Sequence, residues 1–92
     1  MSGGASRTVE IVNKRGLHAR ASAKFVKTAA AFDAEVRVSK DGQTVDARSI
    51  MGLMMLAAGP GSSIEIEAEG AEADAAVTAL EALVRARFDE DE

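Results

Sequence analysis

An alternation of apolar and acidic residues in the second half of the chain sets the strongest limit on its fold. In "SIEIEAE", residues 63–69, Ile64, Ile66 and Ala68 alternate with glutamates. A β-strand points successive side chains to opposite faces of a sheet, so this strand has one apolar face and one charged face. Such strands belong to a sheet that is covered on one side only. The helices of the chain are therefore expected to lie together on that side.

A hairpin and helical segments supply the rest of that fold. "AEVRVSKDGQTVDA" predicts a hairpin, with Val36 and Val38 in its first strand and a tight turn at Asp41-Gly42. The helix from Ala19 is expected to bury Ala23, Val26, Ala29 and Ala30. The expected order is β-α-β-β-α-β-α: strand 7–13, helix 19–31, strands around 36–38 and 44–47, helix 49–59, strand 63–69 and a helix that carries apolar residues over 73–84.

Size and composition indicate one small domain. The chain has 92 residues, and we expect a flexible tail over 1–7, a single domain over 8–88 and an acidic tail over 89–92. It has no cysteine, and the start "MSGGASR" lacks the apolar stretch of a secretory signal, which favours a cytoplasmic location. No apolar run approaches the roughly 18 residues of a membrane span. A net charge of -4 without Trp or Tyr argues against nucleic acid as a partner.

Positive charge is concentrated in one part of this acidic chain. Arg15, Arg20, Lys24 and Lys27 fall within 13 residues, whereas the acids gather in the last third. A local basic surface on an acidic protein indicates a ligand or partner that is locally anionic.

The single histidine, His18, lies at the start of the first expected helix and admits several interpretations. It could cap the helix without any chemistry. One imidazole, with no cysteine and no carboxylate at ligand spacing, leaves too few ligands for a metal, so no metal site is expected. Acid–base catalysis would need a partner, and only Ser22 is near; we expect Ser22 to lie on the helix surface.

A fourth interpretation, a nucleophile that carries a phosphoryl group, fits His18 better. A neutral imidazole is well populated near pH 7 and can attack phosphorus. The free N–H groups of a helix that begins at Ala19 would receive the added negative charge, and Arg20 could add a charge-assisted hydrogen bond. Arg15 is a weaker candidate, because a loop arginine is usually only solvated.

Two strings carry a resemblance to a known family. "GLHARASAKFV" and "RSIMGLMMLAAGPGSSIEI" are similar to the histidine-containing phosphocarrier (HPr) family of the phosphoenolpyruvate-dependent phosphotransferase system, and the likeness runs roughly from Thr8 to Phe88. It implies an α+β, open-faced β-sandwich, with a four-stranded antiparallel sheet and three helices on one face. It also implies that phospho-enzyme I phosphorylates His18 on Nδ1, that an enzyme IIA domain removes the group, and that Arg20 assists. Such a carrier is a substrate of phosphotransferases, not an enzyme, and needs no cofactor. The family usually has proline where this chain has Ala21, and we expect its absence to loosen the helix start.

Ser49 has two interpretations. A serine before an apolar helical run is a common N-cap. The resemblance implies a second role, because Ser49 matches the serine that HPr kinase/phosphorylase modifies in many bacteria. A phosphate there would be tolerated by the helix N-terminus and would place negative charge beside the docking surface.

The helix after Ser49 carries more apolar surface than one face can bury. Core packing is expected for Leu53 and Leu56, while Met54 is open to both interpretations. The resemblance places Ile50 and Met51 in an exposed patch beside His18, with a cationic rim. The expected partner-binding residues are Ala19, Lys24, Lys27, Ile50, Met51 and Met54.

The branch of the family and one rival function stay open. "VEIVNKRGLHAR" and the "FDEDE" end are similar to the nitrogen-related branch (NPr), whereas "SIMG" is similar to the serine-regulated branch; we favour a regulatory system slightly. The rival is an interaction module of the same fold that is controlled at Ser49. A hydrolase that uses His18 as base is remote. The protein is expected to act as a monomer.

Overall fold

The predicted hairpin is formed by β2 (Glu35–Lys40) and β3 (Gln43–Asp46) in a computed structural model that describes residues 4–90. Asp41 and Gly42 both have positive φ, 50° and 84°. Two successive residues of this kind make the turn that matches the twist of paired strands. Lys40 therefore pairs with Gln43, and Val38 with Val45.

The alternating strand is the centre of the sheet. The strand order is β1-β4-β2-β3, and β4 (Ser63–Glu69) pairs antiparallel with both β1 (Gly4–Glu10) and β2. Ile64 and Ile66 are fully buried and Ala68 is nearly so, while the glutamates between them point to the other face. The alternation in β4 thus separates a covered face from an open one, as its sequence predicts.

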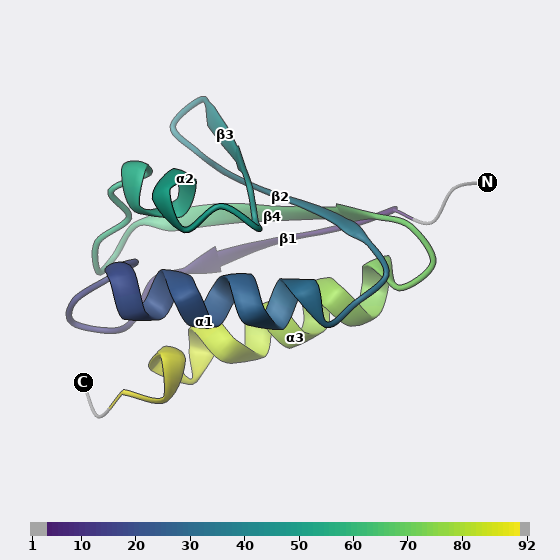
Figure 1. The fold of residues 1–92 in the computed structure, drawn as a ribbon. Coiled ribbons are helices and arrows are strands. Elements are labelled where there is room, and N and C mark those ends of the chain that lie inside the picture. Colours follow the sequence, from purple (N-terminus) through teal and green to yellow (C-terminus); the bar gives the residue numbers. More distant parts are fainter. Residues whose placement is uncertain (1–3, 91–92) are drawn as a thin grey trace.

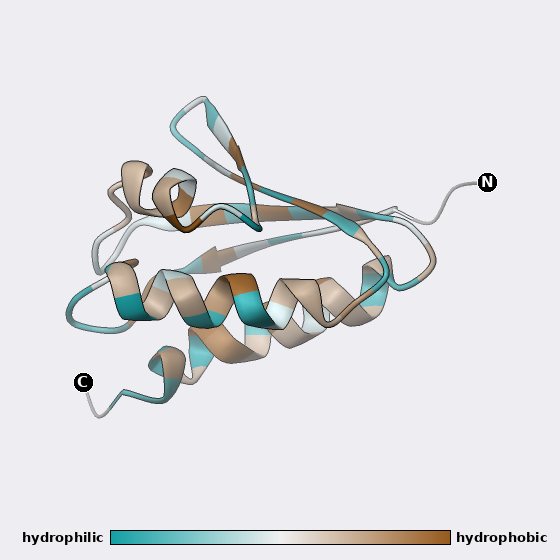
Figure 2. Ribbon diagram, in the orientation of Figure 1, coloured by the Kyte–Doolittle hydropathy of each residue, from teal (hydrophilic) through white to brown (hydrophobic). Residues whose placement is uncertain are grey.

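All three α-helices lie on the covered face (Figure 1). α1 (Ala19–Ala30) and α3 (Ala73–Arg85) run side by side beneath the sheet, and the short α2 (Ile50–Met55) lies near β3 (Figure 1). Hydrophobic stretches occur in both the strands and the helices (Figure 2), and their buried residues form one core. The predicted fold class, an open four-stranded antiparallel sheet with three helices, is confirmed. Within residues 4–90 no helix is long and apolar enough to span a membrane.

The predicted buried face of α1 is wrong in part. The residues that α1 buries are Ala21, Ser22, Phe25 and Ala29, whereas Ala23 and Ala30 are exposed. Phe25 decides the orientation, because burial of its ring is worth roughly 1.5–3 kcal/mol, more than any alanine can contribute. Ala21 and Ala29, each one turn from Phe25, then complete one stripe.

Two predicted boundaries also shift. β1 begins at Gly4, where it pairs with Glu69, so residues 4–7 of the predicted flexible tail belong to a strand; residues 1–3 lie outside the described part. The helix predicted to reach residue 59 ends at Met55. Ala57 has a φ of 53°, which a continuing α-helix does not allow.

The chain folds back after α3 instead of leaving as an acidic tail. A 3-10 segment, η1 (Arg87–Asp89), has positive φ at all three residues, 58°, 55° and 63°. Phe88 is fully buried, and this burial carries the chain toward the start of α1. The predicted tail over 89–92 therefore begins inside η1, and its next residue, Glu90, contacts His18. Residues 91–92 lie outside the described part.

Candidate functional site

The loop before α1 is fixed by a close backbone approach at Gly16. Its φ is +64°, and a Cβ built there would lie 2.3 Å from the carbonyl oxygen of Ala58. The next residue, Leu17, donates its N–H to that same oxygen at 2.9 Å. Buried Asn13 donates from Nδ2 to the carbonyl of Gly16 at 2.9 Å. The residue that follows, His18, therefore has a defined position against the segment after α2.

His18 is the N-cap of α1. Its backbone is extended, and Nδ1 accepts a hydrogen bond from the backbone N–H of Arg20 at 3.2 Å. The side chain is 23% exposed. The capping interpretation of His18 is thus correct as geometry. It does not exclude phosphoryl chemistry, because the ring reaches solvent and Nδ1 faces the positive end of the helix dipole.

The other ring nitrogen contacts an acid that sequence reasoning missed. Nε2 of His18 forms a hydrogen bond with Oε2 of Glu90. The second oxygen, Oε1 of Glu90, accepts from Nδ2 of Asn13 at 3.0 Å. The sequence predicts only an acidic tail at this end of the chain. Phe88, a lone large apolar residue between Arg87 and the acids that follow it, is the signal that could have shown that this segment packs against the domain.

The surroundings of Glu90 favour its ionised form. Burial acts to raise the pKa of Glu90, but the hydrogen bonds from Asn13 and His18 act to lower it. The positive charge of Arg15, and that of His18 whenever its ring is protonated, act in the same direction. The net result is a pKa for Glu90 below its usual value.

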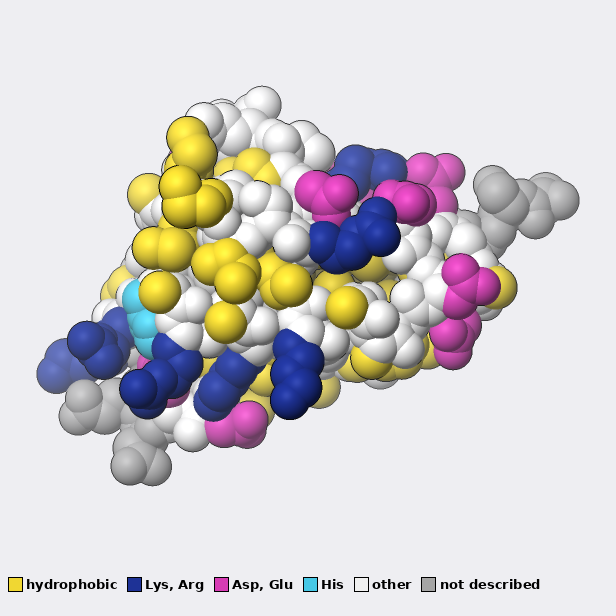
Figure 3. Space-filling model, in the orientation of Figure 1, with side chains coloured by type: hydrophobic (Ala, Val, Ile, Leu, Met, Phe, Trp, Pro, Cys, Tyr) yellow, Lys and Arg dark blue, Asp and Glu magenta, His cyan; other side chains and the backbone are white. Residues whose placement is uncertain are grey.

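The cations expected around His18 differ in what they can do. Arg20 and Lys27 are exposed, and the structure gives their side chains no ion pair within residues 4–90. Lys24 is engaged, because Nζ donates to the carbonyl of Phe88 at 2.7 Å. In Figure 3 the histidine lies between an apolar area and a row of Lys and Arg side chains. The hydrogen bond of Lys24 therefore holds η1 against α1.

An apolar patch lies beside the histidine (Figure 3). We call Ile50, Met51, Met54 and Met55 the α2 patch; they are 40%, 71%, 41% and 70% exposed. Leu53 and Leu56 are buried, as predicted. A depression of about 320 Å³ joins the patch to the site, because Met54 and His18 both line it together with Arg15, Leu17, Ala57, Ala58 and Gly59. Ala19, also expected at the partner surface, is exposed.

Two serines occupy different environments. Ser49 caps α2, since its Oγ accepts from the N–H of Gly52 at 2.9 Å, and its side chain is half-buried. Ser22, expected on the surface, is fully buried and donates from Oγ to the carbonyl of Leu17 at 3.1 Å. That expectation was wrong because α1 is oriented by Phe25. Ser22 is accordingly not available as a nucleophile or as a partner for acid–base work.

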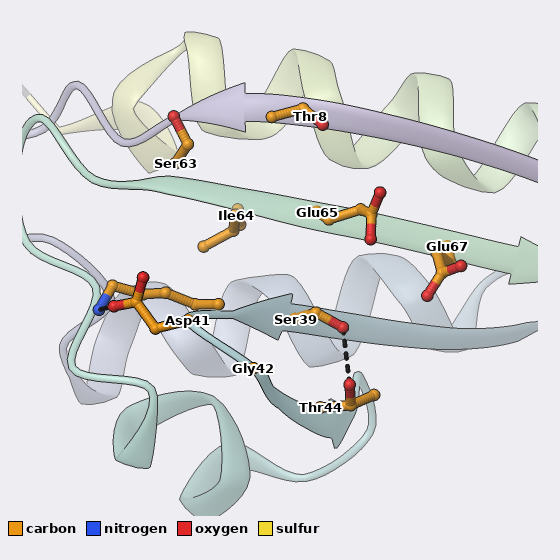
Figure 4. A pocket seen from close by; sticks show the side chains of 10 residues that line it. Thr8, Ser39, Asp41, Gly42, Thr44, Ser63, Ile64, Glu65 and Glu67 are labelled. Carbon is orange, nitrogen blue, oxygen red and sulfur yellow. Dashed lines mark hydrogen bonds and ion pairs between the residues drawn. The ribbon is translucent and has the colours of Figure 1, made fainter.

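The open face of the sheet has a separate, polar hollow (Figure 4). Strands β1, β2, β3 and β4 all contribute to it, and Ser39 and Thr44 share a hydrogen bond of 2.8 Å across β2 and β3. His18 does not line this hollow. Within residues 4–90 no group of three or more His, Cys, Asp or Glu side chains could hold a metal ion.

Comparisons with known proteins give the family. The family model described as "PTS HPr component phosphorylation site" matches residues 5–86. The phosphocarrier protein HPr of Cupriavidus necator is 51% identical over 86 residues, which cover 94% of this chain and 97% of that protein. The phosphocarrier protein NPr of Shewanella violacea is 46% identical over 84 residues, 91% of this chain and 92% of that protein.

Solved structures agree with the sequence matches. HPr from Thermoanaerobacter tengcongensis has a TM-score of 0.91 at 42% identity, covering 96% of this chain and 99% of that one. HPr from Bacillus anthracis has a TM-score of 0.85 at 46% identity, covering 89% and 98%. The match extends over the sheet, the three helices and the histidine loop, and the chain therefore belongs to the HPr family, the phosphocarriers of the phosphotransferase system.

Proposed function

We propose that His18 is the phosphoryl acceptor of this carrier. It takes the group on Nδ1 from phospho-enzyme I and passes it to an enzyme IIA domain. The observation that carries the proposal is the placement of the ring, which is partly exposed and turns Nδ1 toward the N–H of Arg20 at the start of α1. Membership of the family supports the same role.

In the loading step a bond forms between Nδ1 and phosphorus. The bond between phosphorus and the donor atom of enzyme I breaks, and its electron pair stays on that donor atom. Nδ1 can no longer accept from Arg20, so the backbone N–H of Arg20 is released to donate to a phosphoryl oxygen. The exposed guanidinium of Arg20 is free of ion pairs within the described residues and is proposed to bind a second phosphoryl oxygen.

The strength with which this site would bind the phosphoryl group suits a carrier. The helix terminus contributes roughly 0.3–1 kcal/mol, and one charge-assisted hydrogen bond about 1.5–3 kcal/mol. Each 1.4 kcal/mol of extra stabilisation would tilt the exchange about tenfold toward retention. One guanidinium and one helix end therefore hold the group without trapping it.

The α2 patch with Ala19, Lys24 and Lys27 is proposed as the docking surface for both partners. An apolar centre with a cationic rim fits an acidic partner and brief encounters, and methionines adapt to more than one partner. The protein is proposed to act in the cytoplasm, as a monomer.

Mass spectrometry tests the proposal. The protein is mixed with enzyme I, phosphoenolpyruvate and magnesium, and we expect one phosphate that survives base and is lost in acid. His18→Ala should abolish this adduct and keep the circular dichroism spectrum of the fold. A control with another phosphocarrier shows that enzyme I is active. Absence of the adduct on the wild type in that mixture would refute the carrier function.

A second candidate function rests on Ser49. We propose that phosphorylation of Ser49 by an HPr kinase/phosphorylase regulates docking, because Ser49 directly precedes Ile50 and Met51 of the exposed α2 patch. In the rival function this serine alone matters, and His18 never carries phosphate. The mass measurement separates the two when it is made on two mixtures. The rival predicts no phosphate on His18 in the mixture with enzyme I, and an acid-stable phosphate on Ser49 in a second mixture that contains the kinase and ATP.

The IIA domain that accepts the phosphoryl group decides to which branch of the family the protein belongs. We favour the nitrogen-related branch, on the likeness of residues 9–20 and of the acidic end. Phosphorylated protein offered equal amounts of a nitrogen-type and a sugar-type IIA domain should lose its phosphate faster to the first. Faster transfer to the sugar-type domain would assign the protein to sugar uptake.

A further inference from the structure

The contact between Glu90 and His18 joins residues that are 72 positions apart. It depends on the unusual backbone conformation of η1. Three successive residues of η1 adopt left-handed backbone, which costs non-glycine residues roughly 1–2 kcal/mol each. Burial of Phe88 and the hydrogen bond from Lys24 to its carbonyl hold that segment in place. The backbone conformation that places Glu90 beside the ring of His18 is thus fixed.

Hydrogen bonding at the two ring nitrogens selects one tautomer. An ionised carboxylate can only accept, so Nε2 must carry the hydrogen that faces Glu90. A backbone N–H can only donate, so Nδ1 must offer its lone pair to Arg20. Both contacts demand the same form of the neutral ring, with hydrogen on Nε2 and a lone pair on Nδ1.

We propose that Glu90 is a positioning residue for phosphoryl transfer. It holds the hydrogen of His18 on Nε2, so that the lone pair of Nδ1 faces the incoming phosphorus. This inference rests on the proposed function of His18. During transfer no proton has to leave the ring, because Nε2 keeps its hydrogen while Nδ1 bonds to phosphorus. The carboxylate stabilises the positive charge that the ring then carries.

Asn13 determines which kind of atom the side chain of residue 90 must turn toward it. Its Nδ2 donates both to the carbonyl of Gly16 and to Oε1 of Glu90, and its Oδ1 is buried with no partner among residues 4–90. A flipped Asn13 amide would turn its oxygen toward the Gly16 carbonyl. The group facing Asn13 must therefore be an acceptor.

This arrangement makes Glu90→Gln a more informative variant than Glu90→Ala. The new amide would place its oxygen toward Asn13 and its NH₂ toward Nε2 of His18. That NH₂ needs a lone pair on Nε2, which moves the ring hydrogen to Nδ1 and blocks the attacking atom. Alanine only removes the contact and leaves the Arg20 N–H to favour the productive form.

The experiment measures the ring nitrogens and the loading rate separately. Nitrogen-15 NMR of the unphosphorylated protein, at a pH where imidazole is neutral, should show hydrogen on Nε2 in the wild type and a shift toward Nδ1 in Glu90→Gln. Loading from phospho-enzyme I should slow by about tenfold or more in Glu90→Gln and by less in Glu90→Ala. Asp89→Asn removes the same charge from an exposed neighbour and should change neither measurement.

Three outcomes test the proposed role of Glu90. A wild-type tautomer in Glu90→Gln overturns the proposal, whatever the rate. Equal slowing in Glu90→Gln and Glu90→Ala, with unchanged ring nitrogens, also overturns it and leaves a structural role. If the wild type takes no phosphate at all while the tautomer shifts, the proposed function fails and the control of the ring by Glu90 stands.

Discussion

A histidine that caps a helix uses the same lone pair for the cap that it needs for phosphorus. Nδ1 of His18 accepts from the N–H of Arg20, and a phosphoryl group on Nδ1 ends that bond. In the proposed function, the released N–H would then be free to donate to a phosphoryl oxygen. The helix end would be satisfied in both states, by nitrogen before loading and by oxygen after it, so the proposed loading need not disturb α1.

We therefore expect His18→Ala to cost stability, but only modestly. Loss of an N-cap costs about 0.5–2 kcal/mol of unfolding free energy, and urea unfolding followed by circular dichroism measures it. His18→Asn is the matched control, because asparagine is a good N-cap that cannot carry phosphate in this way. It should recover part of the lost stability and still take no phosphate. Equal stability of both variants would show that the cap contributes little.

A second prediction at this scale concerns Glu90 and pH. The pKa of Glu90 is lowered in the folded protein, so its stabilisation is present above the usual carboxyl range and is lost as pH falls through the lowered value. Glu90→Ala should lower the free energy of unfolding by about 1 kcal/mol near neutral pH. The difference from wild type should shrink in acid, measured by urea unfolding across the carboxyl range. A difference that grows on acidification would contradict this assignment.

At the scale of elements, α2 depends on a single side-chain cap. The helix is six residues long, has no charged residue in its first or last turn, and buries only Leu53. The bond from the N–H of Gly52 to Oγ of Ser49 is accordingly a large part of what defines its start.

Substitutions at Ser49 should separate capping from charge. Ser49→Ala should lower the unfolding free energy by about 1 kcal/mol and leave the loading rate of His18 near wild type. Ser49→Asp should keep the cap, because aspartate is a good N-cap, and slow loading by adding negative charge beside the α2 patch. Thermal unfolding and the mass assay measure the two effects. Unchanged loading in Ser49→Asp would argue against regulation at this residue.

The elements also show what the sequence could predict and what it could not. The alternation in β4 and the Asp41-Gly42 turn are local signals, and each predicted its element correctly. The buried face of α1 was missed because two helical stripes of similar spacing compete, and only contact with the sheet selects the one with Phe25. Glu90 was missed for a stronger reason: its place depends on left-handed backbone in η1, which no residue type in "RFD" signals.

Across the whole molecule, the two faces differ in charge: cations gather beside the histidine, whereas the open face of the sheet mixes acids with Arg37 and Lys40. The net charge is -4, yet the row of Lys and Arg beside the histidine forms a basic surface (Figure 3). Glu65 and Glu67 line the hollow on the open face of the sheet (Figure 4), and His18 is not among the residues that line it. Such a charge distribution would favour the approach of an acidic partner to the side of the histidine.

Loading from phospho-enzyme I should consequently depend on salt. The Debye length falls from about 10 Å at 0.1 M to about 3 Å at 1 M, so the second-order loading rate should drop over that range. Lys27→Glu should slow loading by about tenfold at low ionic strength, and the two proteins should converge at high salt. Rapid mixing with phospho-enzyme I, followed by mass spectrometry of the product, measures the loading rates of the wild type and of Lys27→Glu.

Arg37→Glu is the matched control, because it changes the same amount of charge on the open face of the sheet, where Arg37 pairs with Glu69. It should leave the loading rate near wild type if local charge guides docking. Net charge alone would slow the two variants equally. Since both proteins carry the same net charge, a rate difference between them at low salt that vanishes at high salt can come only from where the charge lies, and its size measures how much the basic side contributes to the encounter.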